Sequence, residues 1–350
     1  MKKVTIPEKD VDTIISCTSI DVSKTRLVKI PGTSADTRVY KVDIDLPVGE
    51  AYIVDTPAGA RLASMPEIVG LELEKTALEA AEEAAKFFEY IHEGEENVLL
   101  LHVLRASTGY MLNVAMEKRM KTENIYVRVR YDESSYRDHE GREARAIYTK
   151  VGKLVGDSYI IVVADTVATG NSVIEALGRT IKVLNFKNVK LKEAYFYGFM
   201  SLEGIKNISS FLSEQNLSRV IFLTIQDITP LSSNKYDMPL YGIDEFAYSE
   251  KKEKRILGSI VDRATLKRML PLYYPGMDQP GDWSERQCKL FNGFFYERGD
   301  IEGHLKRSLE MLEKLREIQK GEEWYREWHE QIYNERKERI KNILSIKKYC

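Results

Sequence analysis

Residues 159–173 read YIIVVADTVATGNSV, and the rest of the chain is interpreted outward from this stretch. Its first five residues, 159–163, are hydrophobic and mostly β-branched, which is typical of a buried parallel strand. Asp165 follows at the carboxyl end of that strand, the small residues 168–172 come next, and apolar residues recur at helical spacing from Ile174. The stretch therefore predicts a strand, a short polar loop and a helix.

A loop of this kind can hold a phosphate group. Gly170 allows the backbone to approach a ligand, and successive N–H groups then converge on an anion at a helix N-terminus. The hydroxyls of Thr169 and Ser172 would add donors, and Asp165 could hold a ribose diol or a metal-bound water. The expected phosphate-binding residues are Ala168, Thr169, Gly170, Asn171 and Ser172. The alternative is an ordinary βα turn in which Thr169 and Ser172 cap the helix.

The loop is not one of the common nucleotide-binding motifs. No Lys follows Gly170, as a P-loop requires, and the spacing G-x-G-x-x-G is absent from residues 159–173. A second loop, VLRASTGYM at 103–111, also follows a predicted strand. Arg105 could clamp pyrophosphate oxygens with its planar guanidinium while backbone N–H groups supply further donors. The alternative for Arg105 is a surface arginine at a βα turn.

Predicted strands and helices alternate through the middle of the chain. The strands are expected at 98–103, 125–129, 159–163, 191–199 and 220–225, and the helices at 71–91, 111–120 and 202–212, with a further helix after the loop 168–172 that ends near Leu184. This alternation predicts an α/β fold with a doubly wound parallel sheet. Ligands in such sheets bind at the carboxyl ends of the strands, which is where both singled-out loops lie.

The two ends of the chain differ from this middle part. Short β-like runs separated by Pro and Gly predict an N-terminal β-rich arm over 1–70, followed by an α/β domain over 71–284 and a C-terminal helical subdomain over 285–350. Apolar stripes run along the predicted C-terminal helices, at Leu305, Leu309, Leu312 and Leu315, and at Trp324, Trp328 and Ile332. Such stripes must be buried, either in the chain itself or against a symmetric partner. A partner is favoured, so the helices are expected to serve assembly.

Composition limits the classes of partner and compartment. The formal net charge of the 350 residues is −2, which gives no indication of general nucleic-acid binding. Cys17, Cys288 and Cys350 are far apart, lack zinc-site spacing and are expected to be free thiols of a reducing compartment. No signal peptide or membrane-spanning run is evident, so a soluble cytoplasmic protein without membrane partners is expected.

Four motifs, which occur along the chain in the same order as in that family, resemble uracil phosphoribosyltransferases within the type I phosphoribosyltransferase family. They are D-x-x-A-T-G-x-S at 165–172, L-R-A-S-T-G-Y at 104–110, R-Y-D-E at 130–133 and F-M-S-L-E-G-I at 199–205. Asp227, Leu231, Tyr236, Pro239, Gly242 and Asp244 also fall where that family has comparable residues. The resemblance covers roughly residues 75–245 and includes a single acidic residue before the phosphate loop.

The resemblance implies transfer of the ribose 5-phosphate of 5-phosphoribosyl-1-pyrophosphate (PRPP) to a nitrogenous base, with release of pyrophosphate. It implies catalytic roles for Asp165 and Arg105, and a 5′-phosphate site at 168–172. It implies pyrophosphate binding by Arg105, Ala106, Ser107, Thr108, Gly109 and Arg130, and base binding by Tyr241, Gly242 and Asp244. Mg2+ held mainly by PRPP, and a homo-oligomer with a dimer favoured, are further implications. The charged segment 131–146, with Arg137, Arg142 and Arg145, could form a lid over the site.

The acceptor base is the open point. The segment 236–245 reads YDMPLYGIDE, and bulky Leu240 and Tyr241 stand where the family's base loop has Gly and Leu. A second string, PGMDQPGD at 275–282, also resembles that base loop, although an ordinary turn is favoured for it. A pyrimidine such as uracil is the favoured acceptor. A non-catalytic PRPP-binding regulator and a scaffold protein acting through its C-terminal helices remain as alternatives.

Overall fold

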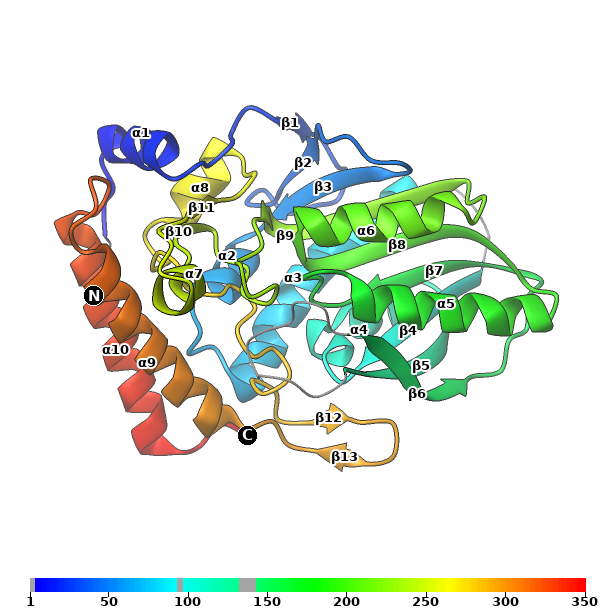
Figure 1. Cartoon of the computed structure of the whole chain (residues 1–350). Helices are drawn as coiled ribbons and strands as arrows, with labels where there is room; N and C mark the ends of the chain where they lie inside the picture. Colours follow the sequence, from blue (N-terminus) through cyan, green and yellow to red (C-terminus); the bar gives the residue numbers. More distant parts are fainter. Residues whose placement is uncertain (1–3, 93–96, 132–142) are drawn as a thin grey trace.

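A nine-stranded sheet forms the centre of the computed structural model, which describes residues 4–92, 97–131 and 143–350 (Figure 1). Its strands are β1 (Thr25–Val28), β2 (Arg38–Val42), β3 (Glu50–Asp55), β4 (Asn97–Leu104), β5 (Thr122–Tyr131), β6 (Ala144–Val151), β7 (Ser158–Ala164), β8 (Lys190–Ser201) and β9 (Arg219–Thr229). They lie in the order β1-β2-β3-β9-β8-β7-β4-β5-β6. The strands from β3 to β5 in this order are parallel, and β1, β2 and β6 add antiparallel edges.

The chain reverses its direction of travel across the sheet between β4 and β7. After β4 it continues outward to β5 and β6, and then returns to place β7 on the other side of β4. The carboxyl ends of β4 and β7 therefore flank a topological switch point, which is where open α/β sheets bind ligands. The two loops singled out from the sequence follow these two strands.

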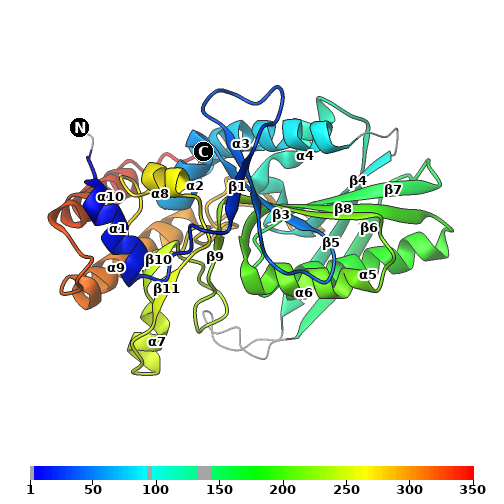
Figure 2. The same ribbon diagram turned by 90° about the horizontal axis from the view of Figure 1, so that it is seen from above.

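Helices cover both faces of the sheet, as Figure 2 shows from above. One face carries α2 (Pro57–Ser64), α3 (Gly70–Ile91) and α4 (Leu112–Glu117), and the other carries α5 (Asn171–Phe186) and α6 (Leu202–Ser213). Alternate residues of each strand supply the two cores: Leu100 belongs to the core with α3, and Leu99 and Leu101 belong to the core with α5. The doubly wound α/β prediction is confirmed.

A second group of elements follows β9 in the chain. It contains β10 (Tyr241–Ile243), α7 (Glu245–Glu250), β11 (Ile256–Gly258), α8 (Arg263–Met269), β12 (Leu290–Phe291), β13 (Tyr296–Glu297), α9 (Ile301–Gln319) and α10 (Glu327–Ile346). The N-terminal helix α1 (Glu8–Cys17) packs against this group, because the indole N–H of Trp328 donates to Asp10 over 3.0 Å. The strands of the predicted N-terminal arm join the central sheet through β3 and β9. The three-part division of the chain stays a prediction.

The apolar stripes of the C-terminal helices are buried within this single chain. Leu305, Leu312 and Leu315 are fully buried, and Trp324 and Trp328 belong to the same core as α3. The reasoning that favoured a symmetric partner to cover these stripes was therefore wrong, because α9 and α10 pack on each other and α9 packs on β10 and α7. A homo-oligomer stays a prediction that these stripes no longer support.

The cysteines also differ from expectation. Cys288 and Cys350 form a disulfide, and Cys17 is a free thiol. The expectation of three free thiols was wrong, because the fold brings together two cysteines that are 62 residues apart in sequence. The inference of a reducing, cytoplasmic compartment from free cysteines loses its basis. In the described part of the chain, no helix has the length and apolar character needed to cross a membrane.

Candidate functional site

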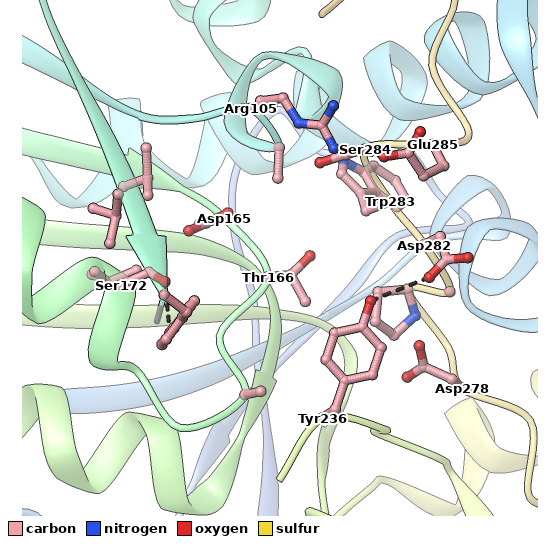
Figure 3. Close-up of a pocket in the computed structure, with 18 of the residues that line it drawn as sticks. Arg105, Asp165, Thr166, Ser172, Tyr236, Asp278, Asp282, Trp283, Ser284 and Glu285 are labelled. Atoms are coloured by element: carbon pink, nitrogen blue, oxygen red, sulfur yellow. Dashed lines mark hydrogen bonds and ion pairs between the residues drawn. The ribbon is translucent and has the colours of Figure 1, made fainter. Parts of the chain in front are cut away.

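A cavity of about 570 Å³ opens at the carboxyl ends of β4 and β7, at the switch point of the sheet (Figure 3). One wall comes from the loops after β4 and β7 and from the end of β5. The opposite wall comes from Tyr236 and the segment 278–285, which is distant from the sheet loops in sequence. Arg105 and Asp165 both line the cavity, as do Ala106, Ala168, Thr169, Gly170 and Ser172.

The loop after β7 lines the cavity and leads into helix α5. Gly170 has a φ of +84° and precedes the first residue of α5, which places the helix N-terminus at the loop. The carbonyl of Ala168 accepts the Ser201 hydroxyl over 2.5 Å, and the carbonyl of Thr169 accepts the Asn207 amide over 2.9 Å. The first-turn N–H groups of a helix have no carbonyl partner within the helix. The loop 168–172 therefore lies at the start of α5, and phosphate binding by it stays a prediction.

Asp165 is buried at the floor of the cavity. Only 5% of its surface is exposed, and burial raises the pKa of its carboxyl to about 8, although the Thr166 backbone N–H bond opposes this shift. The neighbouring Thr166 hydroxyl is 2.5 Å from the hydroxyl of Tyr110. A carboxyl of this kind holds its proton at neutral pH, so it can both donate and accept hydrogen bonds.

The end of β5 contacts the loop 168–172 through Tyr131. Ser172 donates to the hydroxyl of Tyr131 over 2.7 Å, and Tyr131 also lines the cavity. Arg130, which the sequence placed in the pyrophosphate site, is exposed and is not among the described residues that line the cavity. Arg145 pairs with Glu143 over 3.1 Å on the surface. Asp132, Glu133, Arg137 and Arg142 lie outside the described residues.

Arg105, in the loop after β4, lines the cavity, and its guanidinium is paired with two carboxylates. Its Nη2 lies 2.6 Å from Oε1 of Glu285, and its Nη1 lies 2.7 Å from Oε1 of Glu297. The peptide bond from Leu104 to Arg105 is cis. Beyond Ala106, the predicted pyrophosphate residues form the short 3₁₀ helix η1 (Ser107–Tyr110). Ser107, Thr108 and Gly109 are not among the described cavity-lining residues.

The residues expected to bind the base lie behind the cavity wall. Tyr241, Gly242 and Asp244 are buried and are not among the described lining residues. The Tyr241 hydroxyl is 3.1 Å from a ring nitrogen of His329, and the Asp244 carboxylate accepts the Ala247 N–H at the start of α7. These contacts give Tyr241 and Asp244 structural roles in the second group of elements.

The two alternative base loops form one paired unit. The Gly276 N–H donates to the carbonyl of Tyr241 over 2.7 Å, and Pro239 forms a bridge with Asp278. In this unit the segment 236–244 lies mostly behind, and the segment 278–285 faces the cavity. The structure thus brings the PGMDQPGD string to the site, whereas the sequence favoured a turn for it.

The wall opposite the phosphate loop is polar and aromatic. The Tyr236 hydroxyl donates to Oδ1 of Asp282 over 3.2 Å, and Arg307 donates to Oδ2 of the same carboxylate through two nitrogens at 2.9 and 2.7 Å. Trp283 stacks on Tyr110 with ring centroids 4.5 Å apart. Figure 3 shows Tyr236 and Asp282 across the cavity from Asp165 and Ser172. The sequence analysis assigned no site role to Asp282, Trp283 or Arg307. The only signal was the P-G-x-x-x-x-G-D spacing at 275–282, which ends at Asp282.

Comparison with known proteins agrees with the motifs. No protein-family model matches the chain. The uracil phosphoribosyltransferase of Metamycoplasma hominis is 29% identical over 155 residues, which are 43% of this chain and 66% of that protein. The uracil phosphoribosyltransferase of Metamycoplasma arthritidis is 27% identical over 149 residues, which are 42% of this chain and 63% of that protein. The chain therefore spans just under two thirds of the length of these relatives.

Solved structures show a more distant likeness. An adenine phosphoribosyltransferase of Trypanosoma brucei is 10% identical with a TM-score of 0.35, covering 56% of this chain and 90% of that one. An orotate phosphoribosyltransferase of Mycobacterium tuberculosis is 14% identical with a TM-score of 0.30, covering 48% of this chain and 90% of that one. The resemblance that the motifs indicate is confirmed by the two curated relatives: over somewhat under half of its length, this chain is similar to uracil phosphoribosyltransferases of the type I phosphoribosyltransferase family.

Proposed function

We propose that this protein is a phosphoribosyltransferase, which transfers the ribose 5-phosphate of PRPP to a nitrogenous base and releases pyrophosphate. The observation that carries the proposal is the meeting of two loops in one cavity. Arg105 after β4 and Asp165 after β7 line the same space at the switch point of the sheet, together with the phosphate cradle. The curated relatives named uracil phosphoribosyltransferase support this assignment.

The 5′-phosphate of PRPP would bind the loop at 168–172. Its glycine conformation and the N-terminus of the 16-residue helix α5 provide N–H donors and a partial positive charge. Thr169 and Ser172 would add hydroxyl donors, although Ser172 must then give up its bond to Tyr131. Crystals grown in phosphate or sulfate should show an anion at this loop. Anion density elsewhere in the cavity, with this loop empty, would contradict the assignment.

Asp165 would orient the ribose of PRPP. Its buried carboxyl holds a proton at neutral pH, so it can donate to one ribose hydroxyl and accept from another. Departure of pyrophosphate leaves positive charge on the ribose C1, as in glycoside cleavage. Fixed hydrogen bonds to the ribose would hold C1 in line with the attacking base nitrogen while that charge develops.

Arg105 would bind the diphosphate that leaves. Its guanidinium can make two parallel hydrogen bonds to phosphate oxygens and offset the charge released on the leaving group. Among the described residues, no three His, Cys, Asp or Glu side chains gather closely enough to hold a metal ion. Mg2+ would take most of its ligands from phosphate oxygens and water. When bound, Mg2+ would further neutralise the diphosphate.

The base would lie against the wall formed by Tyr236 and 278–285. This segment faces the phosphate loop across the cavity, whereas Tyr241, Gly242 and Asp244 lie behind it. We therefore assign the base-binding role to residues 278–285 and no longer to that earlier set. Uracil remains the favoured acceptor because both curated relatives are uracil phosphoribosyltransferases.

A base panel tests the function directly. The protein should release pyrophosphate from PRPP and Mg2+ only when an acceptor is added, and uracil should be the best acceptor among uracil, orotate, adenine, guanine and hypoxanthine. Calorimetric titration with PRPP alone provides the second measurement. PRPP binding without turnover of any base would replace the enzyme with the non-catalytic PRPP-binding regulator. Failure to bind PRPP would exclude both functions.

A further inference from the structure

In the proposed function, Arg105 is the cation that binds the diphosphate. Two carboxylates of the same chain form ion pairs with it. Glu285 and Glu297 each contact a different terminal nitrogen of its guanidinium, at 2.6 and 2.7 Å. The three side chains are 31%, 20% and 26% exposed, so water screens the two ion pairs only in part. The guanidinium face that a diphosphate would use is therefore already engaged by anionic groups of the same chain.

Both carboxylates are fixed by the C-terminal part of the chain. The second oxygen of Glu285 accepts the backbone N–H of Asp300, at the start of α9, over 2.6 Å. The second oxygen of Glu297 accepts the Asn292 amide over 2.9 Å within the β12–β13 hairpin. Arg128 at β5 adds a third connection, since its guanidinium donates to the Asn292 carbonyl over 2.6 Å. Arg105 and Arg128 thus hold the hairpin against the end of the sheet.

The hairpin is packed at its base and exposed toward its tip. Leu290 is fully buried, and ring centroids of Phe291 and Tyr126 lie 5.7 Å apart and those of Phe294 and Tyr148 5.1 Å apart. Its strands pair through only two residues each, and two-stranded hairpins of this kind are marginally stable by themselves. Phe294, Phe295 and Tyr296 at its tip are 67%, 60% and 63% exposed. In Figure 1 the hairpin extends from the body beside β5 and β6. Segments with little burial open at low free-energy cost, so the exposed β13 side, which carries Glu297, can move away from Arg105 without unfolding the domain.

A diphosphate cannot share Arg105 with these carboxylates. Phosphate oxygens bound to the guanidinium would lie within a few ångströms of Glu285 and Glu297, and like charges at such distances repel strongly in a partly buried site. We propose that Glu285 and Glu297 form an anionic gate, which occupies Arg105 in the free protein and is displaced, with the β12–β13 hairpin, when a diphosphate ligand binds. This gate rests on the proposed function, because it assigns the diphosphate to Arg105.

Neutralising the gate tests the proposal. Glutamine retains the shape of glutamate and can still accept the Asp300 and Asn292 hydrogen bonds, but it does not compete as an anion. Titration of the full-length Glu285→Gln/Glu297→Gln variant with PRPP and with inorganic pyrophosphate, both with Mg2+, should show binding about tenfold tighter than wild type, equivalent to about 1.4 kcal/mol. Glu302→Gln, an ion-paired glutamate on α9, is the matched control and should bind as wild type does.

Hydrogen exchange of residues 289–299 provides a readout that affinity alone does not. In wild type, pyrophosphate should accelerate exchange of these backbone amides because the hairpin leaves Arg105. In the double variant, exchange should already be fast without ligand. Slower exchange in wild type on binding pyrophosphate would overturn the gate.

The outcomes separate the gate from the proposed function. If wild type binds PRPP and the folded double variant binds it equally or more weakly, the gate is wrong and the function stands. If no variant binds PRPP or pyrophosphate, the function fails and the gate fails with it. Adding Arg105→Ala to the double variant should remove the gain, because the gate acts through that residue. Should the double variant not fold, the single Glu297→Gln variant carries the same test, with a smaller gain expected.

Discussion

Gly198 on β8 lies directly against the backbone carbonyl of Asp165. A Cβ atom built on Gly198 would fall 2.0 Å from that carbonyl oxygen, and the φ of Gly198 is +146°. No other residue fits this contact without moving the strand end, because real Cβ atoms do not approach an oxygen so closely. The position of Asp165 at the floor of the cavity thus depends on a glycine that does not itself line the cavity.

Gly198→Ala should displace Asp165 and weaken PRPP binding. Overpacking of a buried site typically costs about 1–3 kcal/mol of stability, and here the displaced group belongs to the site itself. Calorimetry and thermal melts measure both effects. Gly178→Ala in α5 is the control: its Cβ would meet one ring atom at 3.8 Å, and alanine favours a helix over glycine by about 1 kcal/mol. Unchanged PRPP affinity in Gly198→Ala would contradict the argument.

Asp165→Asn should stabilise the free protein more at alkaline pH than at acidic pH. The folded-state pKa of about 8 exceeds the unfolded value of about 3.9. Between these values the folded protein binds a proton that the unfolded chain releases, so the free energy of unfolding falls as the pH rises. Asparagine has no such proton. The gain in melting temperature from Asp165→Asn should therefore be larger at pH 9 than at pH 5.

The control for this pH effect is Asp157, which lies just before β7. Asp157 is exposed, so Asp157→Asn should change the melting temperature by a similar small amount at both pH values. Equal gains for Asp165→Asn at pH 5 and pH 9 would show that Asp165 titrates in its ordinary range and that burial does not hold its proton.

Arg105→Ala should weaken PRPP binding strongly. Hydrogen bonds to charged groups are worth about 1.5–3 kcal/mol, which corresponds to roughly a 10- to 100-fold loss of affinity. Lysine should rescue poorly because an ammonium group cannot make the two parallel bonds of a guanidinium. Arg61→Ala removes a surface pair with Glu72 and is the matched control. PRPP affinity that is the same in Arg105→Ala and wild type would remove Arg105 from the site.

Reduction of the Cys288–Cys350 disulfide should lower the melting temperature. Closing a loop of 62 residues stabilises a protein by about 4 kcal/mol in the chain-entropy model. Cys288→Ser should melt at the same temperature as reduced wild type, and reductant should then have no further effect on it. Cys17→Ser leaves the disulfide intact and should retain the response to reductant. A wild-type melt that is insensitive to reductant would mean that the disulfide does not constrain the chain in solution.

Leu312→Ala should destabilise the protein by about 2–5 kcal/mol, as expected for a fully buried leucine in a packed core. Glu317→Ala, at an exposed position of the same helix, should stay within about 0.5 kcal/mol of wild type. Denaturant unfolding measures both. Truncation after Gly299 should for the same reason give an insoluble or unfolded chain. A small loss for Leu312→Ala would restore an interface role for α9.

The strands of the sheet were predictable because each is a run of hydrophobic residues. The strand expected at 98–103 is β4 (Asn97–Leu104), and the strand expected at 159–163 is β7 (Ser158–Ala164). The helix expected at 111–120 is shorter, because Met111 adopts a left-handed conformation with a φ of +56° and separates η1 from α4. A strand that is buried on both faces must be a run of hydrophobic residues, which is visible in the sequence. The left-handed conformation of one residue, Met111, leaves no such pattern.

The positions of the loop 168–172 and of Arg105 at the carboxyl ends of two strands were also predictable, since the residues that build each loop lie together in one short segment, and their ligands stay predictions. The wall opposite them was not. Glu285 and Glu297 meet Arg105 from 180 and 192 residues away, and no local spacing specifies such a pairing. The PGMDQPGD string at 275–282 was noticed but taken as a turn, because only its pairing with Tyr241 and Pro239 shows which side faces the cavity.

The amino-acid sequence by itself determined the alternating strands and helices, the strand–loop–helix unit around 168–172 and the presence of Arg105 and Asp165 at strand ends. These features depend on local periodicity and on chemistry within a few residues. Only the tertiary structure decided which residues form the opposite wall, that the C-terminal stripes are buried in the chain, and that Cys288 meets Cys350. Those contacts join segments that are distant along the chain, and packing of the whole molecule selects them.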